Sequence, residues 1–99
     1  MLELDKVNRA QFAEFVDQDF EIAVKDAAPL NVRLVEVCSL GAAQAGSREP
    51  FALEFRADAS VRLPQRIYAV SHNQLGTMKI FLVQIAADST GAYFEAVFN

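Results

Sequence analysis

The sequence has one cysteine, one histidine and no tryptophan among its 99 residues. A single cysteine excludes an internal disulfide and a cysteine-rich zinc site, and it fits a reducing compartment at least as well as an oxidising one. A single histidine excludes a two-histidine metal site within one chain. The spacings of calcium-binding and phosphate-binding loops are also missing. We therefore expect no metal, nucleotide or other cofactor.

Basic residues are few and scattered, since nine Lys and Arg stand against thirteen Asp and Glu, for a formal net charge of -4. A nucleic-acid binder concentrates positive charge in order to displace counterions, so we expect no nucleic-acid partner. No apolar run approaches the roughly 20 residues that cross a bilayer. Residues 1–6 lack the apolar stretch of a signal peptide. These absences predict a cytoplasmic protein that does not contact a membrane.

Core-forming residues, in contrast, are abundant. Hydrophobic residues make up 53% of the chain and include eight Phe, which is ample for one core, while the length leaves little room for a second. A chain of this size buries roughly 60 to 70% of the surface that its unfolded form exposes. We expect a single β domain over residues 1–99 that folds without a disulfide or a metal.

A short helix is predicted near the N-terminus. Asn8 can cap it, and Val7 can pack on Phe12 in a hydrophobic staple. Phe12, Phe15 and Val16 share one helical face. At about two turns such a helix is not stable alone, so it must pack on the rest of the domain.

Six strands are predicted after this helix, because apolar residues there recur mainly at every second position. They cover residues 19–25, 30–40, 51–56, 66–72, 77–86 and 93–98. The apolar parity of the second segment changes at Leu34 and Val35, which predicts a β-bulge; burial of both faces is the alternative. The fifth segment is apolar at both parities, which predicts a strand covered on both sides.

The close spacing of these strands predicts a mostly β fold, a small antiparallel six-stranded barrel or sandwich with one short N-terminal helix. We favour the barrel, because closure hides the edges of a small sheet. Residues 72–76 have the composition of a short hairpin connection. Residues 41–47 contain two glycines and no large apolar side chain, and they predict a loop.

Catalytic chemistry is not expected from the few candidate groups. Cys38 becomes a nucleophile only if His72 lies within reach and lowers its pKa. Its apolar neighbours favour a buried thiol instead, and a histidine at a strand end is more often structural than catalytic. Asp17, Asp19 and Glu21 can gather a cation, but they resemble the solvated side of a strand. We therefore predict a protein that is not an enzyme.

Some charged and polar side chains beside predicted turns are candidates for contact with a partner. They are Arg48, Glu49, Arg62, Arg66 and His72. The first two stand directly before a buried-looking strand and can orient the loop above it. The alternative for each is an ordinary surface contact, worth under about 1 kcal/mol for an exposed ion pair.

Several segments resemble a family of small bacterial proteins described as a domain of unknown function, DUF6916. These segments are residues 48–56, 63–68, 72–76, 81–83 and 93–99, and the resemblance extends over most of the chain. The family has no established activity to carry over. Some members are encoded near phage-tail-collar-like proteins, so the resemblance implies a role in accompanying a phage-tail-like assembly.

Together, these observations predict a non-enzymatic structural or protein-interaction module. Its partner would be another protein or a second copy of the chain, contacted through an exposed sheet edge or through the 41–47 loop. The alternative is a small β-barrel that binds an apolar small molecule between its strands.

Overall fold

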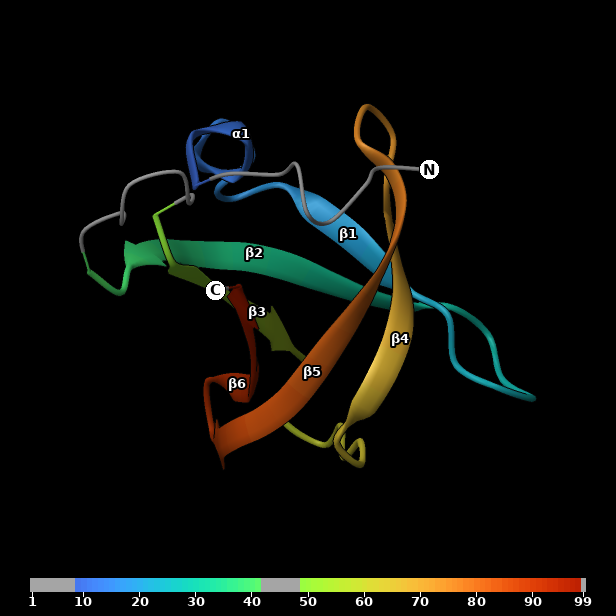
Figure 1. The fold of residues 1–99 in the computed structure, drawn as a ribbon. Helices are drawn as coiled ribbons and strands as arrows, with labels where there is room; N and C mark the ends of the chain where they lie inside the picture. The colour runs from blue at the N-terminus through green and yellow to red at the C-terminus, as the bar shows by residue number, and fades with distance from the viewer. Residues whose placement is uncertain (1–8, 42–48, 99) are drawn as a thin grey trace.

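A computed structural model describes residues 9–41 and 49–98 (Figure 1). Its elements are α1 (Arg9–Ala13), β1 (Asp19–Ile22), β2 (Leu30–Ser39), β3 (Phe51–Ala57), β4 (Arg66–His72), β5 (Gly76–Asp88) and β6 (Gly91–Phe98). The strands form a closed barrel in the order β1-β2-β3-β6-β5-β4, and all neighbours are antiparallel. The predicted fold class is confirmed, and the barrel is the correct choice between barrel and sandwich.

The longest strand, β5, serves two neighbours in turn. Its residues 76–82 pair with β4, and its residues 83–88 pair with β6. The register of the second pairing shifts between Gln84 and Ala86, and such a bulge bends a strand and increases its twist. One strand can therefore pass from one wall of the barrel to another (Figure 1).

The barrel closes where β1 meets β4. Glu21 lies opposite Ser71 and Ile22 lies opposite Val70. The ladder continues past the end of β1, because the Ala23 N–H donates to the carbonyl of Ala69 at 2.9 Å. Each strand then has a neighbour on both sides. The exposed sheet edge that we expected as a contact surface is not provided by the closed strand order. The expected loop contact at residues 41–47 lies, apart from Gly41, outside the described residues.

The core is filled by apolar side chains from the inward parity of every strand. Phe20 on β1 and Phe55 on β3 pack edge to face, with ring centroids 5.4 Å apart. The buried side chains of the described residues are all apolar. None of their buried polar side-chain atoms lacks a hydrogen-bond partner.

The helix α1 covers one end of this core, next to β2 (Figure 1). Phe12 is fully buried there, with its ring 5.9 Å from the rings of both Phe51 and Phe98. Those two rings stack on each other at 4.8 Å. Phe15 is also buried, but it lies in the turn after α1, because the helix ends at Ala13 and is shorter than the two turns predicted. The predicted cap at Asn8 and its staple partner lie outside the described residues.

Two further predictions from strand parity have different outcomes. The bulge in β2 is confirmed, because its register with β3 shifts between Leu34 and Glu36. Burial of β5 on both faces is wrong, since Phe81 and Ile85 are 52% and 47% exposed. In a closed barrel only one parity of a strand can point inward, and on β5 the residues at positions 78, 80 and 82 do so.

Replacing Phe12 with Ala should lower the free energy of unfolding by about 3 to 5 kcal/mol, because it empties a fully buried aromatic site. Phe81→Ala removes the same side chain from the half-exposed outer face and should cost about 1 kcal/mol or less. Urea unfolding followed by circular dichroism measures both values. Equal losses for the two variants would contradict the role of α1 as the cover of the core.

Candidate functional site

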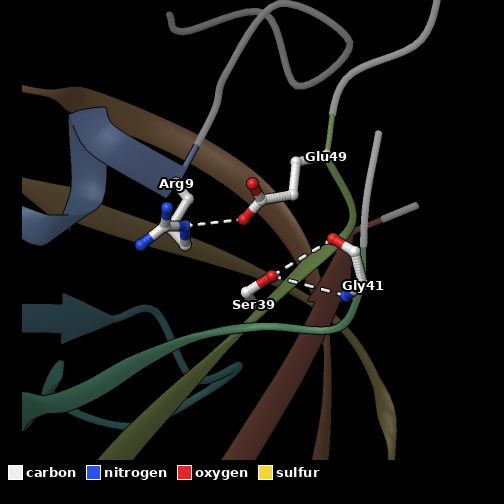
Figure 2. A network of polar contacts seen from close by, with 4 residues as sticks. All are labelled: Arg9, Ser39, Gly41 and Glu49. Carbon is white, nitrogen blue, oxygen red and sulfur yellow. Dashed lines mark hydrogen bonds and ion pairs between the residues drawn. The ribbon is translucent and has the colours of Figure 1, made fainter. Parts of the chain in front are cut away.

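The polar side chains singled out in the sequence do not converge on one site. Arg48 lies outside the described residues. Glu49 accepts a hydrogen bond at 2.8 Å from Nε of Arg9, which ties the start of β3 to α1 (Figure 2). A hydrogen bond from the Ser39 hydroxyl, followed by the contact with Arg9, lowers the pKa of Glu49. The role of Glu49 in this structure is to join two elements.

The two arginines beside Pro64 also have different surroundings. Nη1 of Arg62 donates to the carbonyls of Ala59 and Val61 at 2.8 Å each. This arginine therefore orders the loop before β4. Arg66 is exposed at the first position of β4.

His72 is the last residue of β4, and the contacts of its ring are structural. Its ring centroid lies 4.6 Å from that of Phe15 and 4.8 Å from that of Phe20. The backbone N–H of Gln74 donates to Nδ1 at 3.0 Å, so Nδ1 carries no proton. Nε2 then carries the proton and donates to Oε1 of Gln18 at 2.8 Å. Both ring nitrogens are occupied by contacts that hold the end of the barrel together.

Cys38 differs from expectation, because it is exposed rather than buried. It lies on the outer side of β2, whereas the His72 ring packs on inward-facing phenylalanines. Desolvation raises the pKa of Cys38, and the charges of Glu36, Glu95 and Glu54 raise it further. A thiol with a raised pKa is a poor nucleophile near neutral pH. No group of three metal-ligating side chains occurs among the described residues.

The outer face of β4 and β5 carries an apolar ridge, formed by Ile67, Phe81 and Val83. Ile67 is 63% exposed and lies directly opposite the half-exposed Phe81. Val83 follows on the same side of β5 and is partly buried. Large apolar side chains that gather on the outside of a filled barrel are typical of an interaction surface.

Beside this ridge, three carboxylates form a glutamate row across the neighbouring strands. Glu36 on β2 lies opposite Glu54 on β3, and Glu54 lies opposite Glu95 on β6. Glu95 in turn lies opposite Val83 of the ridge. Like charges directly opposite each other destabilise a sheet. Within the described part of the chain, no ion pair joins these three carboxylates to a basic side chain.

The glutamate row changes the ionisation of its central member. Partial burial raises the pKa of Glu54, and the charges of Glu36 and Glu95 raise it further. The charged form of Glu54 is therefore less favourable in the folded protein than in the unfolded chain.

An arginine row runs parallel to the glutamate row on the same outer face. It consists of Arg33 and Arg56, which lie opposite each other on β2 and β3. The row continues to Tyr93 on β6, which lies opposite Arg56. Arg33 has only an exposed contact with Asp19, at 3.8 Å from Nε to Oδ1. A pair this exposed contributes little, so Arg33 remains available to a partner.

Because Gly91 has no side chain, the Arg56 side chain can lie close to β6. A Cβ at position 91 would lie 2.7 Å from Cγ and 2.9 Å from Cδ of Arg56. Only glycine leaves room for this stem, which lies against the strand. A polar groove of about 600 Å³ runs beside it and is lined in part by Asn31, Asp58 and Thr90.

A family model described as Domain of unknown function (DUF6916) matches residues 7–98. The chain belongs to this family. The match includes every described helix and strand of the barrel, and it confirms the resemblance seen in the sequence. Membership of the DUF6916 family assigns no activity, and neither a curated protein nor a solved structure matches the chain. No helix within residues 9–41 and 49–98 has the length and apolar character needed to cross a membrane.

In this DUF6916 chain, Glu54→Gln should raise the free energy of unfolding by about 0.5 kcal/mol at neutral pH, since it removes a like charge from a cross-strand row. Because the pKa of Glu54 is raised in the folded state, the folded protein is destabilised as pH rises through that pKa. The gain from the substitution should therefore disappear as pH falls below the glutamate range.

Urea unfolding at several pH values measures this effect. The matched control is Glu21→Gln, which neutralises an exposed glutamate that lies opposite Asn31 and Ser71 rather than other carboxylates. A similar gain in the control, or a gain at position 54 that persists in acid, would show that the row does not strain the sheet.

Proposed function

We propose that the protein is a non-enzymatic structural or protein-interaction module that binds a protein partner through the outer face of its barrel. The observation that carries this proposal is the exposure of the apolar ridge of Ile67, Phe81 and Val83 on a barrel whose core is already filled. Apolar side chains of this size gain free energy when a partner removes them from water. The ridge therefore supplies the hydrophobic centre of an interface.

The filled interior supports this function over the alternative of a barrel that binds an apolar small molecule. Five fully buried phenylalanines and six other large apolar side chains occupy the core. The polar groove of about 600 Å³ lies beside Arg33 and Arg56 and is lined largely by charged and polar residues. An apolar ligand would find few apolar contacts there.

Several parts of the proposal depend on the sequence. The net charge of -4 favours a protein partner over nucleic acid or an anionic membrane surface. Residence in a bacterial cytoplasm is part of this proposal. The family resemblance supports a place beside a phage-tail-like assembly. In that setting the module would bind another component of the particle or of its assembly machinery.

The test compares affinity purification of the tagged protein with that of a variant carrying Ile67→Ser and Phe81→Ser, in a bacterium that encodes the protein. Leu40→Ser is the control, because it removes a half-exposed apolar side chain outside the ridge. We expect the same protein partner to be retained by the wild type and the control, and at least about tenfold less by the double variant, a loss of about 1.4 kcal/mol.

Quantitative mass spectrometry of the retained proteins gives the ratio, and circular dichroism verifies that each variant is folded. Equal retention by all three proteins, or no protein retained above a tag-only background, would contradict an interaction function of the ridge.

A further inference from the structure

The two charged rows on the outer face of β2, β3 and β6 are complementary to each other. Arg56 and Glu54 are two positions apart on β3, and Tyr93 and Glu95 are two positions apart on β6. Side chains two positions apart on a strand point to the same face and are separated by about 7 Å. A basic row and an acidic row therefore run side by side, each crossing the same strands.

This pattern complements a rotated copy of itself. A two-fold axis in the plane of the face, parallel to the rows and midway between them, turns each row onto the other. Arg56 then meets the partner's Glu54, and Arg33 meets the partner's Glu36. In a two-fold dimer each of these contacts occurs twice. Such an arrangement would form four arginine–glutamate pairs.

We infer that the protein self-associates through this face, with the arginine row of each copy on the glutamate row of the other. This inference rests on the proposed interaction function and names one partner, a second copy of the chain. It uses different side chains from those of the apolar ridge, which adjoins the glutamate row where Val83 lies opposite Glu95.

The charges favour a second copy over a foreign basic segment. A wholly basic segment would match the three carboxylates but would place its own positive charge beside Arg33 and Arg56. A second copy presents both signs in the required order. Arginine is also suited to this role, because its planar guanidinium can donate two hydrogen bonds to one carboxylate.

The surroundings of the rows also favour a contact. Gly91 lets the Arg56 stem lie flat against β6, which restricts the side chain before a partner arrives. On the other side of the glutamate row lie Cys38, Ala52 and Val97, opposite one another across the three strands. Cys38 and Val97 are exposed and would lie at the rim of such a contact.

Charge reversal at two positions tests the inference by sedimentation velocity and light scattering, from about 1 µM to about 1 mM protein. The wild type should form dimers, and more weakly at high salt. Glu54→Arg and Arg56→Glu should each raise the dimer dissociation constant at least tenfold, because each places like charges against each other.

An equimolar mixture of these two variants should recover the wild-type association, since one protomer is then basic at both positions and the other acidic. A chain carrying both substitutions should also dimerise. The controls are Glu21→Arg and Lys79→Glu, which make the same charge changes on β1 and β5 and should leave the dissociation constant unchanged.

A wild-type protein that stays monomeric over the whole range would overturn the inference, as would single reversals without effect or a mixture that fails to recover. Recovery also demonstrates that the single variants are folded. None of these outcomes depends on the Ile67–Phe81 ridge, so retention of a protein partner by the ridge would still support the proposed function if self-association failed.

Discussion

The barrel depends on the way one long strand, β5, is shared between two neighbours. Its first half pairs with β4 and its second half with β6, with a bulge between Gln84 and Ala86 in the second half. Because β1 then joins β4, the ladder has no terminal strand. Closure separates the side chains of every strand into one set that fills the core and one set that faces the surroundings. The first set is apolar, and the second contains the groups that can contact a partner.

The same strand register determines which outward-facing side chains lie next to each other. An apolar ridge on β4 and β5 adjoins a row of three glutamates, and that row adjoins a row of two arginines. Partial burial raises the pKa of Glu54, the charges of Glu36 and Glu95 raise it further, and the alignment of the three carboxylates weakens the sheet in the free protein. A second copy that presents its arginines to this row would relieve the repulsion. The charge pattern would then connect the stability of the barrel to the proposed self-association.

Much of the fold could be predicted from the sequence, because its signals are local. Alternation marked the strands, and the change of parity at Leu34 marked the bulge. The phenylalanine spacing marked the presence of the helix but not its length, since only Phe12 lies within α1. The exposure of Phe81 and Cys38 could not be predicted, since both parities around them are rich in apolar residues and only the closed barrel shows which one points inward. The charged rows could not be predicted either. Glu54 and Glu95 are distant in the sequence, and their alignment depends on the register between β3 and β6.

Barrel closure between β1 and β4 is the central claim, and amide hydrogen exchange followed by NMR tests it most directly. The informative group is the Ala23 N–H, which donates to the Ala69 carbonyl across this closure. A closed barrel predicts that the Ala23 amide is protected to a degree similar to the amides between β3 and β6, which exchange only when the core opens. Exchange of Ala23 as fast as that of an unpaired loop amide would mean that β1 and β4 are open edges, and the division into inner and outer faces would fail.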